Sequence, residues 1–206
     1  MKRFCFVLFS TVLLLASAAI AQPPTMSQFS ADMTSKSAKG DTATGKFYMG
    51  DRKTRMDMTS HGMEVRMLFD LKAKKSYMLM VAQHMYMEHN IDEQPKGNMA
   101  GPSVPSFKPE CDPDHFTCKS VGTEMVNGRL CDKWVYTAKD AGNEAANQTT
   151  WVDMKIRVPV RVIHGDGSQM DFTNIKEGPQ EASLFELPAG YQPFNPMGMM
   201  GGRKPH

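Results

Sequence analysis

The chain after residue 26 is a succession of short apolar-alternating runs separated by Gly, Asn, Asp and Pro, and this pattern limits the fold most strongly. The runs recur every 8 to 12 residues, and no long segment repeats with the 3.6-residue period of a helix. The pattern predicts strands at 27–34, 44–50, 53–59, 63–71, 74–81, 84–90, 117–126, 129–138, 148–153, 157–164, 168–175 and 183–187. An antiparallel sheet, barrel or sandwich accommodates such strands. Pro159 cannot donate a ladder hydrogen bond, so its strand should be an edge strand or bulged.

Methionines occupy alternating positions in several of these runs, in a chain that carries 19 of them. Side chains two residues apart point to the same face of a strand, so alternation collects them on one face. The residues predicted to form this apolar, ligand-binding face are Met56, Met58, Met63, Met67, Phe69, Met78, Met80, Met85 and Met87. Methionine is flexible and polarizable, so such a surface adapts to varied apolar ligands.

The first 21 residues predict an export signal. Lys2 and Arg3 precede an apolar stretch, and Ala19-Ile20-Ala21 supplies a small-residue cleavage site before Gln22. Cleavage reduces the 24 basic residues to 22, equal to the 22 acidic residues. The signal peptide predicts a periplasmic or secreted protein. A neutral protein has no strong electrostatic field to attract nucleic acid, so we expect no nucleic-acid partner.

The remaining 185 residues are enough for one domain, predicted at 22–194. Within it, 91–116 is rich in Pro and Gly and is predicted to be a loop insertion. The Gly- and Met-rich tail 195–206 has no strand pattern and is predicted to be disordered.

Three cysteines remain after cleavage: Cys111, Cys118 and Cys131. The Asn127-Gly128 turn predicts a hairpin that sets Glu124 opposite Cys131 and Thr137 opposite Cys118. Cys118 and Cys131 would then be displaced by about six residues, roughly 20 Å at ~3.3 Å per residue. A disulfide needs Cα atoms within about 7 Å, which favours Cys111 with Cys118. The alternative is three thiols that are small buried residues.

The second half of the sequence resembles the bacterial outer-membrane lipoprotein carrier-like (LolA/LolB-like) superfamily. The residues that carry the resemblance are "TTWVDMKIRVPVRV" followed by "MDFTNIKEGPQEASLFELPAGY". The first half adds a strand-turn-strand cadence with Asp70 before a turn, and the likeness covers about residues 28 to 194. It implies a mainly β fold: a curved antiparallel sheet, an unclosed half-barrel with a short helix or loop cover, whose apolar concave face holds lipid chains. We identify the chain as similar to an uncharacterised exported family of this fold.

No catalytic motif stands out, since the sequence contains no Gly-x-Ser-x-Gly, His-Glu-x-x-His or P-loop. We therefore expect a non-enzymatic protein without a cofactor. We also expect it to be a monomer. Its expected partners are an apolar small molecule or lipid, with transient membrane or envelope-protein contact. The alternative is a periplasmic copper(I)-binding protein, because thioethers and imidazole bind copper(I); Met85, Met87 and His89 share a strand face there, opposite to that of His84.

Overall fold

The computed structural model describes residues 27–92, 111–140 and 142–194. The predicted signal peptide 1–21 and tail 195–206 lie outside the described residues, as does most of the predicted insertion 91–116. No helix among the described residues is long and apolar enough to span a bilayer.

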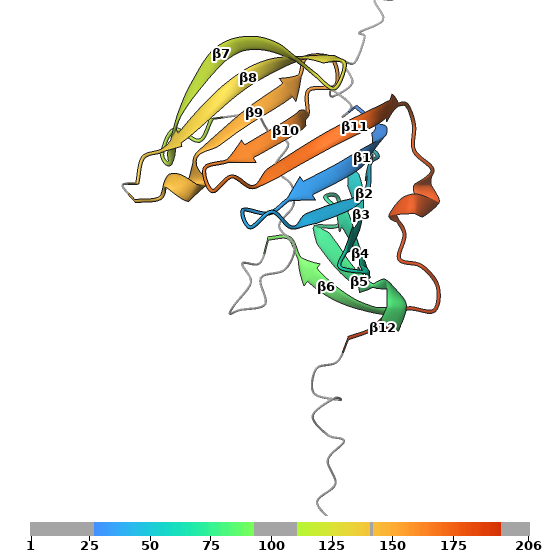
Figure 1. The fold of residues 1–206 in the computed structure, drawn as a ribbon. Coiled ribbons are helices and arrows are strands. Elements are labelled where there is room, and N and C mark those ends of the chain that lie inside the picture. The colour runs from blue at the N-terminus through green and yellow to red at the C-terminus, as the bar shows by residue number, and fades with distance from the viewer. Residues whose placement is uncertain (1–26, 93–110, 141, 195–206) are drawn as a thin grey trace, which may run out of the picture.

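Twelve strands form one large, unclosed sheet (Figure 1). The strands are β1 Phe29–Lys36, β2 Thr42–Met49, β3 Lys53–Ser60, β4 Met63–Asp70, β5 Lys75–Met80, β6 Met85–Asn90, β7 Phe116–Val126, β8 Arg129–Ala138, β9 Gln148–Asp153, β10 Pro159–His164, β11 Gln169–Glu177 and β12 Gln192–Pro193. Short 3₁₀ helices lie at η1 Val81–Gln83, η2 Glu144–Ala146 and η3 Ala182–Phe185. The predicted mainly β, half-barrel fold is confirmed.

Two antiparallel meanders make up the sheet, in the order β12-β6-β5-β4-β3-β2-β1-β11-β10-β9-β8-β7. Strands β1 to β6 form one meander and β7 to β11 the other. They join where β1 pairs with β11, and β12 adds to the β6 edge as a parallel strand. The sheet therefore has two separate edge strands, β12 and β7, which do not pair with each other.

The Asn127-Gly128 turn forms the predicted hairpin, with both residues at positive φ and Glu124 opposite Cys131. A bulge between Ser120 and Thr123 then shifts the register by one residue, with Gly122 at φ +108°. Cys118 consequently faces Tyr136, so the prediction of Thr137 was wrong. The bulge consumes one extra residue of β7 that alternation could not reveal.

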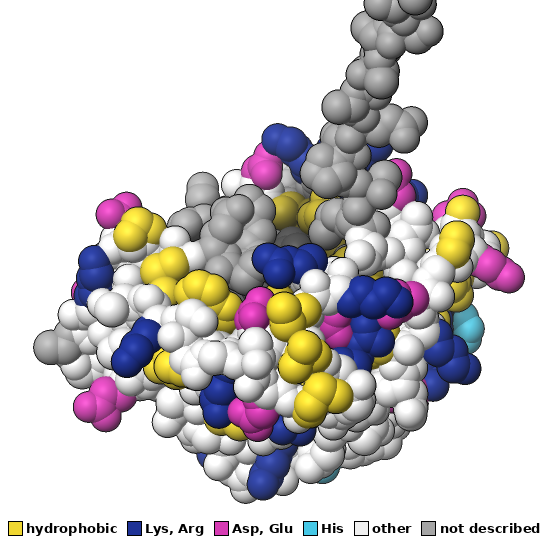
Figure 2. All heavy atoms as spheres, turned by 90° about the horizontal axis from the view of Figure 1, so that it is seen from above, with side chains coloured by type: hydrophobic (Ala, Val, Ile, Leu, Met, Phe, Trp, Pro, Cys, Tyr) yellow, Lys and Arg dark blue, Asp and Glu magenta, His cyan; other side chains and the backbone are white. Residues whose placement is uncertain are grey.

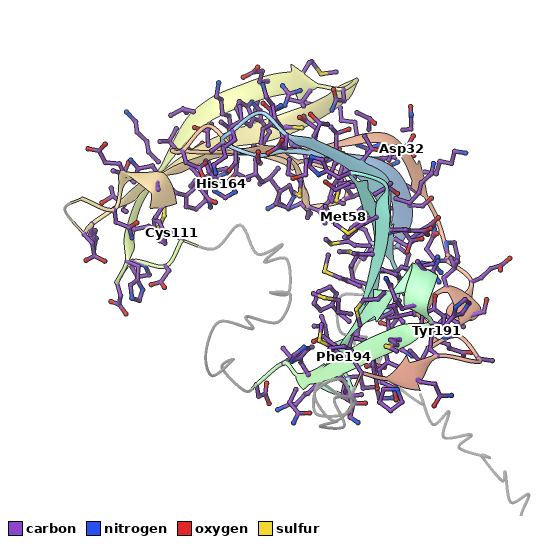
Figure 3. All side chains as sticks on the ribbon, turned by 60° about the horizontal axis from the view of Figure 1, so that its bottom comes forward. Asp32, Met58, Cys111, His164, Tyr191 and Phe194 are labelled. Atoms are coloured by element: carbon purple, nitrogen blue, oxygen red, sulfur yellow. A yellow bond between two sulfur atoms is a disulfide. The ribbon has the colours of Figure 1, made fainter. Side chains whose placement is uncertain are left out.

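The sheet curves so strongly that it has a concave and a convex face (Figure 3). Met58 lies on the inner side of the curve and Asp32 on the outer side. Bulges in the β1–β11 pair and at Pro159 in the β9–β10 pair increase the local twist. Pro159 thus begins a bulged strand in the interior of the sheet, one of the two predicted outcomes.

The core lies where the two meanders meet. Phe29, Phe47 and Phe172 are buried and in mutual ring contact, with centroids of Phe47 and Phe172 4.7 Å apart. Apolar residues from the β7–β8 and β9–β10 tips belong to the same cluster: Val126, Cys131, Ile156 and Val158. Burial of these side chains fixes the junction, because each large apolar side chain contributes about 1.5–3 kcal/mol.

Residues 178–194, which we call the strap, cross the convex face. The strap contains η3, where a strand was predicted at 183–187; that prediction was wrong. Leu184 N–H donates to Glu181 O (3.1 Å) in a helical turn, and Phe185 is 9% exposed. A Cβ at Gly50 would lie 2.7 Å from the Phe185 ring, so the two are in close contact. The strap ends in β12, which was not predicted.

Candidate ligand-binding face

Methionines form two neighbouring rows across the concave face. The first row follows the cross-strand partners Phe47, Met56, Met67, Met78 and Met87 from β2 to β6. The second row follows Met33, Gly45, Met58, Val65, Met80 and Met85 from β1 to β6. Directly opposed residues have Cβ atoms about 4.5–5.5 Å apart, so each row is a continuous apolar strip. We call these strips the methionine rows.

A third row beside them includes hydroxyl groups. Thr54, Phe69, Ser76 and His89 are successive partners from β3 to β6. Thr54 and Ser76 are buried, and His89 is half-buried. Along the described strands β1 to β6, the concave positions contain no Asp, Glu, Lys or Arg. This half of the concavity therefore suits an uncharged ligand.

The nine residues predicted for the apolar face occupy different environments on this surface. Met56, Met58, Met67, Met78, Met80, Met85 and Met87 lie half-buried in the methionine rows, and Phe69 is fully buried in the third row. Met63 shares their face but stands at the β3–β4 hairpin end opposite Ser60, and it is 68% exposed. Met33 and Phe47, which sequence reasoning missed, continue the rows into β1 and β2.

The candidate copper ligands lie along β6, beside the two-residue edge strand β12. Met85, Met87 and His89 face Met80, Met78 and Ser76, respectively. His84 is in the η1–β6 turn with left-handed backbone, and its ring lies 5.4 Å from that of Tyr191. The described residues contain no cluster of three His, Cys, Asp or Glu side chains arranged to hold a metal ion.

The concave face of the second meander is more polar. Trp134, Tyr136, Gln148 and Thr150 share one face, because Thr150 pairs with Trp134 and Gln148 pairs with Tyr136. The pairs of β9 with β10, β10 with β11 and β11 with β1 connect this face to the concave face of the first meander. The Thr150 hydroxyl is buried without a hydrogen-bond partner among the described residues. The concavity thus changes from thioethers to indole, phenol and hydroxyl groups from one meander to the other.

On the convex side, an ion cluster connects the meander to the strap. Asp57 accepts bonds from Arg55 (Nη2, 2.6 Å) and Arg66 (Nε, 2.8 Å). Arg55 also donates to the backbone carbonyl of Leu184 at 3.2 Å. Seen from above (Figure 2), acidic and basic side chains are intermixed on the surface. In the described strands β1 to β6, Asp, Glu, Lys and Arg therefore lie on the outer face, and the methionine rows remain free of charge.

A second ion cluster orders the β9–β10 turn. Asp153, 1% exposed, accepts bonds from Arg129 and from the backbone amides of Lys155 (2.7 Å) and Ile156 (2.9 Å). Burial alone would raise the pKa of Asp153, but these donors outweigh it and hold the pKa below its ordinary value. Asp153, which lies in the segment "TTWVDMKIRVPVRV", thus has a structural role at this turn.

The predicted disulfide is confirmed: Cys111 and Cys118 are bonded, with Cα atoms 5.8 Å apart. Cys131 is a free thiol with no exposed surface, and burial raises its pKa to about 11. Disulfides persist in oxidising compartments, so the bond is consistent with a protein outside the cytoplasm.

Residues 30–157 match the model of a family described as a domain of unknown function, DUF4412. The chain belongs to the DUF4412 family. No curated protein sequence matches this DUF4412 protein significantly.

Solved structures show where its fold recurs. An uncharacterized conserved protein from Thermus thermophilus is 11% identical with a TM-score of 0.57, over 82% of this chain and 90% of that one. A crystal structure of MucB is 14% identical with a TM-score of 0.54, and the match covers 80% of this chain and 58% of that one. MucB also matches in the structure of a MucA/MucB complex from Pseudomonas aeruginosa. A LolA superfamily protein from Nitrosomonas europaea matches with 10% identity and a TM-score of 0.37, over 78% and 90%. The DUF4412 protein therefore shares its fold with the Thermus thermophilus protein and with MucB.

Proposed function

We propose that this DUF4412 protein is an exported, non-enzymatic binding protein that holds an uncharged, lipid-like ligand on the concave face of its sheet. The observation that carries the proposal is the pair of methionine rows across β1 to β6, on a face without charged side chains in the described strands. Unbranched thioether side chains adapt to flexible apolar chains, and a concave surface removes more of such a chain from water than a flat one.

The proposed setting is the periplasm or the exterior of the cell. The Cys111–Cys118 disulfide and the predicted signal peptide support it. We propose transient contact with an envelope protein, and the similar protein MucB, which has been solved in complex with MucA, supports a protein partner. We propose that the protein itself is a monomer that acts without a cofactor.

Native mass spectrometry of the protein purified from its own host tests the proposal directly. A co-purifying lipid is the expected result. A bound copper ion, with no lipid, would contradict the proposal in favour of the methionine and histidine ligands around Met85, Met87 and His89.

A variant with Met67, Met78 and Met80 replaced by leucine separates the two ligand classes. Volume-conserving apolar exchanges cost less than ~1.5 kcal/mol, so the fold and the binding of an uncharged fluorescent lipid should survive. Leucine has no lone pair to donate, so any copper(I) binding should collapse. If the variant loses copper(I) binding and neither protein binds lipid, the proposal is wrong.

A further inference from the structure

Thr150 carries the one buried side-chain oxygen or nitrogen in the described part of the chain that lacks a hydrogen-bond partner. The residue is 4% exposed and lies in β9. A buried hydroxyl without a partner lowers stability, and most buried polar atoms in folded proteins are paired. Valine has the same shape and an equal preference for strands, so packing alone does not require a hydroxyl there.

The Thr150 side chain belongs to the concave face and continues the ligand-binding surface. Thr150 pairs with Val162 of β10, and Val162 pairs with Met170 of β11. Met170 is two residues from Phe172, which faces Met33 in the second methionine row. Three strand spacings of about 4.8 Å separate β9 from β1, so the hydroxyl lies roughly 14 Å beyond Met33, where that row ends.

Trp134 adds a second donor at the same place. It is the cross-strand partner of Thr150 on β8, it is half-buried, and no hydrogen bond of its indole N–H occurs within the described residues. An indole N–H donates only, while a hydroxyl both donates and accepts. The two groups together can bind an ester carbonyl or a hydroxyl.

Charge on this side of the concavity selects against an anionic head group. The concave positions of the described strands β8 to β10 contain no Lys or Arg. Asp132, on the same face as Trp134, is the charged residue there, and its carboxylate lies 3.8 Å from Arg157 Nη1. A carboxylate or phosphate head group would therefore be repelled by Asp132 and would find no Lys or Arg at the concave positions of these strands.

We propose that Thr150 and Trp134 form a subsite for the uncharged polar head, an ester or hydroxyl, of an amphiphile whose chain lies on the methionine rows. This inference rests on the proposed lipid-binding function. It narrows the ligand class to neutral lipids such as acylglycerols, in preference to free fatty acids.

Titration of the exported chain with two fluorescent probes tests the subsite. One probe is a monoacylglycerol, and the other is a hydrocarbon of equal length without a head group. Thr150→Val should weaken monoacylglycerol binding about tenfold, as expected for the loss of one buried hydrogen bond, and leave hydrocarbon binding within about twofold. The same variant should raise the urea midpoint of the ligand-free protein, because it removes an unpaired buried hydroxyl.

Two further variants keep the test decisive. Thr150→Ser retains the hydroxyl and should bind monoacylglycerol like the wild type. Trp134→Phe keeps an aromatic ring but loses the indole N–H, so its binding of monoacylglycerol should be weaker. Unchanged monoacylglycerol binding in both Thr150→Val and Trp134→Phe would overturn the subsite while the proposed function stands. A free fatty acid that binds the wild type more tightly than the monoacylglycerol would also overturn it. A wild type that binds neither probe would instead overturn the proposed function.

Discussion

Gly45 of β2 and the backbone of Asp57 in β3 approach so closely that a Cβ at position 45 would lie 1.8 Å from the Asp57 carbonyl oxygen. Gly45 sits in the second methionine row, opposite Met58. The absence of a side chain at position 45 lets the two strands approach this closely. The shape of the second methionine row therefore depends on this contact.

Gly45→Ala should lower the free energy of unfolding by about 1–3 kcal/mol, because the added methyl group must displace the backbone of a neighbouring strand. Urea denaturation measures the change. Gly62→Asn is the control: position 62 has φ +75°, a conformation that Asn tolerates, and a Cβ there meets nothing within 4 Å. Equal losses in the two variants would mean that the close contact at Gly45 has no special role.

Asp153→Asn should lower the free energy of unfolding by about 3–5 kcal/mol at neutral pH, because it leaves the partly buried Arg129 without its buried partner. The folded pKa of Asp153 lies below its ordinary value of 3.8. Its stabilising contribution is therefore complete above the unfolded pKa and is lost as the pH falls through the folded pKa. The wild type should lose this stability below about pH 4, and Asp153→Asn should lack that part of the curve.

Glu177→Gln is the matched control, because Glu177 is a more exposed partner of the same Arg129. Its effect should stay below about 1 kcal/mol. A pH profile for Asp153→Asn that still follows the wild type between pH 2 and 4 would assign the acid sensitivity to other carboxylates.

The sequence predicted the strands well where a turn residue and alternation agreed. Asn127-Gly128 set the register of the β7–β8 hairpin near its turn, and i, i+2 methionines placed Met56, Met58, Met78 and Met80 on one face. Local patterns carry no information on partners distant in the chain, so the β1–β11 junction and the β6–β12 pair could not be predicted. The five-residue run at 183–187 is too short to distinguish a strand from a helical turn.

The candidate site was predictable only in part for a related reason. Alternation of apolar residues reveals which side chains share a face of the sheet. It does not reveal where a cross-strand row of side chains ends, or which side chains are buried by the rest of the fold. Met63 continues the alternation of β4 and nevertheless stands exposed at the hairpin end. Thr150 is an ordinary strand residue in the sequence, and only packing shows that its hydroxyl is buried without a partner.

Phe185→Ala should release the strap from the convex face. Phe185 packs against Gly50, and removal of a buried aromatic side chain lowers the free energy of unfolding by about 3–5 kcal/mol. Hydrogen exchange of the Gln192 and Phe194 amides, which donate to His84 O (2.9 Å) and Tyr86 O (2.7 Å), should become faster. Leu187→Ala, at a more exposed strap position, should change neither quantity appreciably. Unchanged exchange in Phe185→Ala would show that β12 is held independently of η3.

The reduced, buried Cys131 should be unreactive in the folded protein. Its thiol has no exposed surface and its pKa is raised to about 11, so the reactive thiolate is scarce at pH 8. In a chain that begins at Gln22, a maleimide should modify no thiol in buffer and one thiol in denaturant, while Cys111 and Cys118 stay bonded. Reduction before denaturation should leave three thiols for the maleimide to modify in denaturant. It should also lower the free energy of unfolding by about 2–3 kcal/mol, as for a short disulfide loop. Labelling of Cys131 before unfolding would place it at the surface.

A charge in the methionine rows should abolish the binding of uncharged lipid. Met78 lies between Met67 and Met87 in the first row, so the carboxylate of Met78→Glu would stand among thioethers without a cation on that face of the described strands. Binding of the uncharged fluorescent lipid should weaken at least tenfold. A bound lipid would remove water from the carboxylate, and an apolar chain offers no interaction that replaces this lost hydration. Met63→Glu is the control, since Met63 is exposed at the hairpin end and should retain wild-type binding. If Met63→Glu weakens binding as much as Met78→Glu, the ligand extends to the β3–β4 end; if neither does, the methionine rows are not the binding surface.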